Sequence, residues 1–527
     1  MRLGELIRDL PVHAIGDAAA AADVRICDIT EDSRTVMPGS LFVARVGEKS
    51  DGRAFVADAI AAGATAILSD RPVDAGPVCS LVSSDVALAT AMLAERFYGN
   101  PSKMLKLIGV TGTNGKTTIA YLIHQLLNAS KVRCGLISTV CIDDGRGRSD
   151  SMLTTPPALE ISQALATMVE SGCTAAVMEV SSHALEQKRV AALSFDIGIF
   201  TNLTGDHLDY HKTMDAYAAA KSTLFRMLGP EGLAIVNADD PASERMVTGC
   251  RSRVLRCTAG ARGDAECRVV AGPATFAGTD AALVGPWGRV ESTIPLVGAH
   301  NLMNTLESVA AVTALGVAPA QVARALTLVQ APPGRLEPVV AGGIDAGFSI
   351  FVDYAHTDDA LANVLRTVRP LLDAGGTARG RLIVVFGCGG DRDRSKRPRM
   401  ARVACELADV VVVTSDNPRT EDAQAIIRDI LAGMEPGSPP AHVDADRRAA
   451  IAWAVDHAER GDIVVIAGKG HETYQLLPDG RGGIHRTDFD DRLVARAALE
   501  RRFRPGSEHT GEHGMTAAGH AQGAMDS

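Results

Sequence analysis

Hydrophobic and polar positions alternate in blocks along most of the chain, where short apolar runs are followed by stretches with helical spacing. The apolar runs typical of buried strands lie at 105–111, 175–180, 197–200 and 233–237. Apolar residues at helical spacing follow at 119–128, 216–228 and 298–315. Strands that alternate with helices favour a mostly parallel sheet, with ligand loops after the carboxyl ends of the strands. The pattern therefore predicts an α/β protein.

The same pattern divides the chain, whose 527 residues allow three or four domains. We predict domains at 1–104, 105–337 and 338–505, with a disordered tail at 506–527. The first should contain strands at 23–29, 40–44 and 65–69 and helices at 55–62 and 84–97. The last restarts the alternation after a proline-rich connector, with strands at 348–353, 381–386, 410–414 and 462–467. We expect a central P-loop-type sheet and a Rossmann-like C-terminal domain.

Composition narrows the class of protein. Hydrophobic residues make up 46% and charged residues 22%, which is ordinary for a soluble globular protein. The net charge of −10 disfavours a nonspecific nucleic-acid binder. Ten cysteines without a C-x-x-C pair indicate reduced thiols, and no apolar run approaches membrane-spanning length. Since no signal peptide pattern is found, we expect a cytoplasmic protein. We also expect a monomer that binds small molecules and neither nucleic acid nor membrane.

A glycine-bearing loop joins the run at 105–111 to the helix that follows. It reads Gly112-Thr113-Asn114-Gly115-Lys116-Thr117-Thr118. The glycines let backbone N–H groups close on a phosphate, Lys116 supplies a charge for the terminal phosphates, and Thr117 is placed to ligate Mg²⁺. The common pattern has a glycine five positions before Gly115, where this chain has Val110, so the loop is a shorter variant. The loop predicts a nucleoside triphosphate site, against the alternative of a simple glycine turn.

Polar clusters follow other predicted strands of the central domain. Glu179 closes one strand and could ligate a metal or be merely solvated. The segment 201–211 holds two His and two Asp residues within six positions, which suits Mg²⁺ or substrate positioning as well as a solvated turn. Lys221 looks like an ordinary helical lysine, and the loops around 32–34 and 47–52 look like ordinary turns.

Together these motifs resemble the Mur ligase family of ATP-dependent amide-forming enzymes over about residues 25–495. The resemblance is closest to members that add meso-2,6-diaminopimelate to the D-glutamate γ-carboxylate of UDP-N-acetylmuramoyl-L-alanyl-D-glutamate in peptidoglycan precursor synthesis. It implies ATP and Mg²⁺ as cofactors and an acyl phosphate intermediate. The phosphate loop alone would also fit a folylpolyglutamate synthetase.

The resemblance assigns roles residue by residue. It implies ATP contacts at residues 112–118 and at Asn304, Arg335 and Asp353. Metal or catalytic roles fall to Lys116, Thr117, Glu179, His207 and Lys221, the last as a carbamate formed with CO₂. The residues implied for the UDP precursor are Ser33, Glu48, Lys49, Ser50, Thr154, Thr155, Ser181, Gln187 and Arg189. Glu48, Lys49 and Ser50 differ in type from the residues usual in that loop.

The amino-acid pocket implied by the resemblance also has a physical rationale. Diaminopimelate carries one carboxylate more than lysine, so selecting it requires a cationic fork. Arg419, assisted by Arg392, would supply that fork. The amino group and nearby polar atoms would be held by Asp416, Asn417, Pro418, Gly468 and Glu472.

Three alternatives stay open at this point. A folate-type ligase could use the same acyl phosphate chemistry, but the N-terminal domain and the Asp-Asn-Pro-Arg turn at 416–419 disfavour it. A lysine-adding sister ligase differs at Arg419. A nonenzymatic nucleotide switch would need no polar loops in the last domain.

Overall fold

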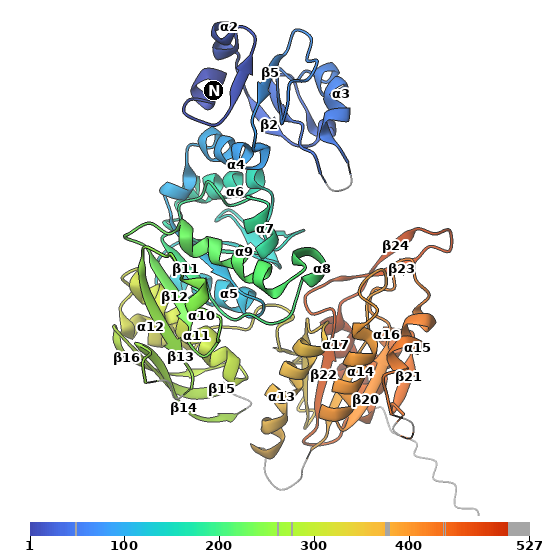
Figure 1. The fold of residues 1–527 in the computed structure, drawn as a ribbon. Helices are drawn as coiled ribbons and strands as arrows, with labels where there is room; N and C mark the ends of the chain where they lie inside the picture. The colour runs from blue at the N-terminus through green and yellow to red at the C-terminus, as the bar shows by residue number, and fades with distance from the viewer. Residues whose placement is uncertain are drawn as a thin grey trace, which may run out of the picture. The chain divides into compact units, whose positions relative to one another are not determined.

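The computed structural model describes residues 1–47, 50–260, 263–275, 278–374, 380–435, 437 and 439–503 (Figure 1). The chain divides into two compact units. One comprises Met1–Glu337 with Thr367–Ala374, and the other Pro338–Arg366 with Gly375–Ser527. The predicted tail at 506–527, like Glu48 and Lys49, lies outside the described residues. The α/β class is confirmed, whereas the three domain limits stay predictions.

The first unit begins with a five-stranded sheet in the order β1-β5-β4-β3-β2. Its strands are β1 (His13–Ile15), β2 (Asp28–Thr30), β3 (Ser40–Val43), β4 (Ala66–Ser69) and β5 (Cys79–Val82). Its helices are α1 (Leu3–Leu6), α2 (Ala18–Asp23), α3 (Val56–Ala61) and α4 (Val86–Phe97). The strand predicted at 23–29 is wrong over most of its length. The alanine run before it forms α2, which Asp17 caps by accepting from the Ala19 and Ala20 N–H groups.

The second part of this unit is an eleven-stranded sheet with β6 (Lys106–Thr111) near its centre. Parallel neighbours on either side include β7 (Cys134–Ile137), β10 (Ala175–Glu179), β11 (Ile197–Phe200), β12 (Leu233–Asn237) and β13 (Arg253–Thr258). The sheet extends at one end through β14 (Cys267–Thr275), β15 (Gly278–Gly285) and β16 (Gly288–Ile294). At the other end it extends through β8 (Cys141–Asp143) and β9 (Arg148–Asp150). Antiparallel pairing joins β14 to β15 and β15 to β16, and the sequence pattern did not predict these strands.

Helices cover both faces of this sheet, so its central strands are buried. One apolar core joins the sheet to α5 (Lys116–Ala129), α11 (Ala299–Ala314) and α12 (Pro319–Leu326). The other core includes α6 (Ala158–Glu170) and α9 (Met214–Met227). Short helices α7 (Ser182–Glu186), α8 (Leu208–His211) and α10 (Ser243–Met246) lie in the connections. Burial on both faces explains the continuous apolar runs of the sequence.

The second unit contains a sheet in the order β17-β18-β22-β19-β20-β21. The strands are β17 (Glu337–Pro338), β18 (Ser349–Asp353), β19 (Leu382–Phe386), β20 (Val410–Thr414), β21 (His442–Asp444) and β22 (Ile463–Ala467). Helices are α14 (Lys396–Leu407), α15 (Ala423–Leu431), α16 (Arg447–His457), α17 (Asp491–Arg502) and the part of α13 (Asp358–Ala374) that ends at Arg366. A separate hairpin is formed by β23 (Tyr474–Pro478) and β24 (Ile484–Asp488). Strands β18 to β22 pair in parallel, so their polar loops emerge at one edge.

Candidate functional site

The phosphate loop lies directly between β6 and α5, at the carboxyl edge of the central sheet. Val110 is an interior residue of β6, which explains why the loop is shorter than the common pattern. Gly112 has a φ of 151°, and a Cβ there would lie 1.9 Å from the Thr201 hydroxyl oxygen. A side chain at this position would therefore collide with the loop after β11. That loop braces the phosphate loop, because the Asn202 carbonyl and side-chain oxygens accept from the N–H groups of Thr113 (2.9 Å) and Asn114 (2.9 Å).

Lys116 begins α5 and folds back over the loop. Its Nζ donates to the carbonyl oxygens of Gly112 (2.9 Å) and Thr113 (2.8 Å). Burial lowers the pKa of the Lys116 ammonium, and the charge of Arg335 lowers it further, while Glu179 and Asp206 oppose the shift. The buried Lys116 ammonium at this loop favours an anionic ligand such as a polyphosphate.

Glu179 ends β10 beside the loop and is completely buried. The Thr117 hydroxyl donates to Glu179 Oε2 (3.0 Å), and Thr139 donates its N–H to Oε1 (2.7 Å) and its hydroxyl to Oε2 (3.1 Å). The solvated-strand-end interpretation of Glu179 is therefore wrong. Sequence reasoning missed Thr139, which follows β7 and could have been found by the rule that polar residues after parallel strands converge.

Lys221 is 1% exposed and points from α9 to the same loop. Its Nζ donates to the Gly112 carbonyl (2.7 Å) and lies 4.3 Å from the centre of the Tyr217 ring. Burial, and then the charge of Lys116, hold the pKa of Lys221 well below its ordinary value, although Asp206 acts in the opposite direction. Lys221 is therefore not an ordinary solvated helical lysine. A buried amine of lowered pKa can act as a nucleophile at neutral pH.

Imidazole and phenol rings gather on the segment that follows β11. His207 has a left-handed φ of 54°, its Nε2 lies 3.5 Å from Asp206 Oδ2, and its ring centre lies 4.8 Å from that of His183. His211 is held between the Ser182 hydroxyl (2.9 Å from Nε2) and Glu186 Oε2 (2.9 Å from Nδ1). Because α7 carries both partners, His211 fixes this turn to the segment after Glu179.

Four of the residues predicted for the UDP precursor form one hydrogen-bonded network. The Thr155 hydroxyl donates to the Glu179 carbonyl (2.8 Å) and accepts from the Ser181 N–H (3.0 Å). Arg189 donates to the Thr155 carbonyl (2.6 Å) and to Gln187 Oε1 (2.7 Å). The network begins directly behind Glu179, so a ligand held by it would reach the phosphate loop. Thr154 joins through its hydroxyl oxygen, which lies 3.2 Å from that of Thr139.

Four further residues were predicted to contact ATP or the UDP precursor, and the structure shows the surroundings of each. Asn304 lies against the phosphate loop, since a Cβ on Gly115 would be 2.7 Å from its side-chain oxygen. Ser33 lies in the one-turn helix 33–35 after Asp32, and Ser50 is exposed. Asp353 ends β18 in the second unit, where its carboxylate accepts from the Ala355 N–H (2.8 Å).

In the second unit, two loops meet after β19 and β20. A Cβ on Gly390 would lie 1.9 Å from the Pro418 carbonyl oxygen, so the glycine turn after β19 packs directly on the 416–419 turn. Arg419 has a φ of 56° and donates to the Gly390 carbonyl (2.7 Å). A Cβ on Gly389 would touch both the Arg419 guanidinium (2.9 Å) and the Arg392 side chain (3.9 Å). The Arg419 guanidinium and the Cγ atom of Arg392 therefore both lie close to Gly389, while the Arg392 guanidinium donates to the Asp391 carbonyl (3.3 Å).

Carboxylates also follow β20 and β22 in this unit. Asn417 donates to Glu472 Oε2 (2.8 Å), and a Cβ on Gly468 would lie 3.2 Å from Asp416 Oδ2. Lys469, which sequence reasoning passed over between Gly468 and Glu472, is completely buried among them. A lysine between two glycines gives no sequence signal of burial. The predicted acceptor residues thus form one cluster, with Lys469 added to it.

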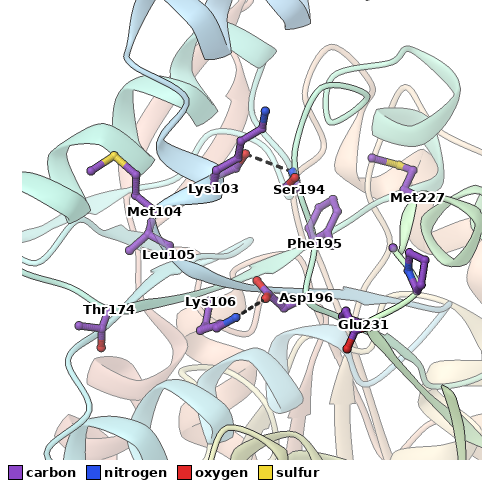
Figure 2. A pocket seen from close by; sticks show the side chains of 14 residues that line it. Lys103, Met104, Leu105, Lys106, Thr174, Ser194, Phe195, Asp196, Met227 and Glu231 are labelled. Atoms are coloured by element: carbon purple, nitrogen blue, oxygen red, sulfur yellow. Dashed lines mark hydrogen bonds and ion pairs between the residues drawn. The ribbon is translucent and has the colours of Figure 1, made fainter. Parts of the chain in front are cut away.

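A further cavity of about 700 Å³ opens at the opposite, amino edge of the central sheet (Figure 2). It is lined by the residues that precede β6 and β11, among them Lys103, Met104 and Phe195. Lys106 and Asp196 form an ion pair of 2.7 Å at its wall. Since the predicted site residues do not line it, the cavity is separate from the site at the carboxyl edge.

Three structural features bear on other predictions. In the described ranges, no helix is long and apolar enough to cross a membrane. No cluster of three His, Cys, Asp or Glu side chains suited to a metal occurs among the described residues. All ten cysteines are described and free, as predicted.

Comparisons with known proteins cover all three predicted domains. The description "Mur ligase family, catalytic domain" matches residues 25–98, "Mur ligase middle domain" matches 110–312, and "Mur ligase, glutamate ligase domain" matches 334–470. A UDP-N-acetylmuramoyl-L-alanyl-D-glutamate--2,6-diaminopimelate ligase of Synechococcus elongatus is 45% identical, over 95% of this chain and 99% of the relative. A Listeria innocua protein of the same name is 42% identical over the same shares.

Solved structures agree with these matches. One of a UDP-N-acetylmuramoyl-L-alanyl-D-glutamate--2,6-diaminopimelate ligase is 33% identical, has a TM-score of 0.67 and covers 95% of this chain and 99% of that chain. A Mycobacterium tuberculosis folylpolyglutamate synthase is 20% identical with a TM-score of 0.58, over 72% of this chain and 92% of that one, and shares the fold alone. The family matches, the full-length relatives and the converging strand-end loops lead to one conclusion: the chain is a ligase and belongs to the Mur ligase family.

Proposed function

We propose that this chain is an ATP-dependent amide ligase that joins meso-2,6-diaminopimelate to the D-glutamate γ-carboxylate of UDP-N-acetylmuramoyl-L-alanyl-D-glutamate. The relatives named above carry this activity in their names at 42–45% identity over 95% of the chain. The reaction serves peptidoglycan precursor synthesis, and we place it in the cytoplasm and in a monomer. The alternatives of a folate-type ligase and a nonenzymatic switch are disfavoured by these full-length matches.

The ATP end of the reaction would use the phosphate loop. Lys116 can exchange its bonds to the Gly112 and Thr113 carbonyls for bonds to the terminal phosphates, whose charge it neutralises. The substrate γ-carboxylate attacks the γ-phosphorus in line, ADP leaves, and an acyl phosphate forms. The acceptor amine then attacks the acyl carbon, inorganic phosphate leaves with the acyl–oxygen bond pair, and the amine loses a proton to give the amide. Positioning and charge neutralisation supply most of the acceleration.

Mg²⁺ would be held by Thr117, Glu179 and His207. The fit is good for Thr117 and Glu179, whose oxygens already lie 3.0 Å apart beside the phosphate loop. Mg²⁺ usually takes one or two protein oxygens and completes its shell with phosphate oxygens and water. When bound, it neutralises charge on the phosphates.

Lys221 would react with CO₂. The free amine attacks the carbon, a C–N bond forms, and one proton is released to leave a carbamate. The lowered pKa of Lys221 supports this step, because only the neutral amine is nucleophilic. Once carbamylated, the side chain presents an anion in place of a cation and could serve a metal beside Gly112.

The observation that supports the assignment of the acceptor is the position of the Arg419 guanidinium, which lies against Gly389 and Gly390 in the loop that also carries Arg392, while Asn417 in the turn of Arg419 donates to Glu472. Two guanidinium groups suit the second carboxylate of diaminopimelate, and the carboxylates suit its ammonium. L-lysine lacks that carboxylate and would leave the fork unpaired. The lysine-adding alternative is therefore disfavoured.

The test is phosphate release by the purified protein with ATP, Mg²⁺ and UDP-N-acetylmuramoyl-L-alanyl-D-glutamate, with meso-diaminopimelate or L-lysine as acceptor. We expect release with diaminopimelate and little with lysine. Lys116→Ala is the matched control for contaminating ATPases. Equal release with lysine would refute the acceptor assignment, and silence with both acceptors would refute the ligase proposal for this substrate.

A further inference from the structure

Lys469 follows β22 and is 0% exposed, in the middle of the acceptor cluster. Its Nζ donates to Asn417 Oδ1 (3.0 Å) and Glu472 Oε2 (3.2 Å) and lies 3.7 Å from Asp416 Oδ1. Burying an ammonium group is costly unless anions and hydrogen-bond acceptors surround it. These three polar partners are all residues assigned to the acceptor pocket, and the Nζ also lies 5.7 Å from the centre of the Tyr474 ring. The polar contacts of Lys469 are therefore made with the residues of the acceptor pocket itself.

The anions around Lys469 are incompletely satisfied. Asp416 is 6% exposed, and within the described residues its Oδ1 atom has no hydrogen-bond partner. A buried acceptor without a donor is rare and is costly to maintain. By contrast, Glu472 Oε2 accepts from both Asn417 (2.8 Å) and Lys469. The cluster therefore retains an acceptor that a ligand donor can complete.

The charges of the three ionised groups can be counted. Asp416 and Glu472 contribute two negative charges, and Lys469 contributes one positive charge. The sum is −1, which one ammonium group balances. Without Lys469, the two carboxylates would carry twice the uncompensated charge, which is strongly unfavourable in a buried site.

We propose that Lys469 is a positioning residue of the acceptor pocket, which holds Asn417 and Glu472 in place and sets the pocket's charge to match one ammonium group of the amino acid. This inference rests on the proposed function. Lys469 need not touch the reacting atoms. It acts through Asn417, whose side-chain oxygen it shares with the Leu476 N–H (3.0 Å), and through the carboxylate of Glu472.

A double variant can distinguish a role of Lys469 in charge from a role in packing. The two roles predict opposite changes in how the double variant binds the acceptor. Lys469→Met raises the negative charge of the cluster to −2, and Glu472→Gln reduces it to zero. The double variant Lys469→Met/Glu472→Gln restores −1. If charge is what matters, the double variant should bind the acceptor better than Glu472→Gln. If Lys469 only packs, the second change should add to the damage.

The experiment measures KM for meso-diaminopimelate, ATP and the UDP precursor in the wild type, both single variants and the double variant. We expect Lys469→Met to raise KM for the acceptor by at least about tenfold, with the other two KM values little changed. We expect the double variant to have a lower acceptor KM than Glu472→Gln. Arg428→Met is the control, since it removes a positive charge from an exposed position on α15.

The outcomes are distinct. An acceptor KM in the double variant equal to or above that of Glu472→Gln overturns the inference, as does an unchanged KM in Lys469→Met. Should Lys469→Met alone not fold, the comparison of the double variant with Glu472→Gln decides the question. A wild type that releases no phosphate with any acceptor refutes the proposed function itself, whereas an active wild type with an unaffected Lys469→Met refutes only the inference.

Discussion

Glu307 in α11 offers a prediction about stability that follows from one buried carboxyl group. It is 0% exposed, and neither carboxyl oxygen has a hydrogen-bond partner within the described residues. Burial raises the pKa of Glu307 well above its ordinary value of 4.5, and the negative charge of Asp239 adds to the shift. In the folded protein the group therefore keeps its proton over a pH range in which the unfolded chain has lost it.

The sign and size of the effect follow from proton linkage. Because the pKa of Glu307 is raised by folding, its contribution to stability is complete below pH 4.5 and is lost as the pH rises toward the folded pKa. Over that window the free energy of unfolding falls by about 1.4 kcal/mol per pH unit. Glu307→Gln removes this dependence but keeps an unpaired polar group. Glu307→Met also removes that group, whose burial without a partner costs about 1–3 kcal/mol.

The assay is the thermal midpoint of the two variants and the wild type between pH 5 and 8. We expect both variants to lose less stability than the wild type as the pH rises, and Glu307→Met to be the most stable. A change of 1 kcal/mol shifts the midpoint by about 2–4 °C in a domain of 150–250 residues. If Glu307→Gln showed the same slope against pH as the wild type, Glu307 would not be protonated in the folded protein, and the reasoning would be refuted.

Glu95 is the matched control, because it is also buried but has partners. Its carboxyl oxygens accept from the hydroxyl groups of Ser102 (2.6 Å) and Ser162 (3.2 Å). Glu95→Met leaves both hydroxyls without this acceptor and should destabilise the protein at pH 5, where Glu307→Met stabilises it. The same substitution thus has opposite effects that depend on hydrogen bonding and not on burial alone.

Three further predictions concern the site and its supports. Arg419→Ala should cost about 2–5 kcal/mol in transition-state stabilisation with diaminopimelate, measured as kcat/KM relative to L-lysine; an unchanged ratio would remove Arg419 from the pocket. Lys221→Arg should abolish phosphate release, because a guanidinium cannot form the carbamate, and full activity would exclude that modification. Asp491→Asn should lower the free energy of unfolding in denaturant by about 3–5 kcal/mol, because it leaves the buried charge of Arg447 without its counterion. The double variant Asp491→Leu/Arg447→Met should recover most of this loss.

The phosphate loop and the central strands could be predicted from sequence because a single rule governs them. Buried parallel strands are continuous apolar runs, and the residue after each run lies at the carboxyl edge. Glu179, Thr201 and Asp353 follow strands in this way, and the first two meet at the phosphate loop. The strands β14, β15 and β16 escaped prediction, since alternating small and polar residues at 267–294 do not form such runs.

Predictions failed where burial depends on partners distant in sequence. Lys469 and Thr139 belong to the site through contacts with residues 40–52 positions away. Thr139 follows a parallel strand and could have been found by the rule for strand ends, whereas nothing local distinguishes Lys469 from a solvated lysine. The same holds for Lys221, whose buried contact with Gly112 spans 109 positions. For that residue the family resemblance supplied the role that sequence pattern alone did not.

Buried charged groups in this protein differ in how many of their donor and acceptor atoms are hydrogen-bonded. This difference distinguishes groups that support the fold from groups that are available to a ligand. Arg447 uses Nε and Nη2 for Asp491, Nη1 for the Ser415 carbonyl (3.2 Å) and Nη2 also for the Ala467 carbonyl (2.9 Å), so all three of its nitrogens are engaged in bonds within the protein. It ties together the ends of β20 and β22, directly before the two acceptor loops. Asp416, one residue after Ser415, instead keeps Oδ1 without a donor. A buried arginine that fixes the backbone through four hydrogen bonds beside an incompletely bonded carboxylate is the arrangement expected of a preorganised ligand pocket, because the rigid support holds the open acceptor in place before the ligand arrives.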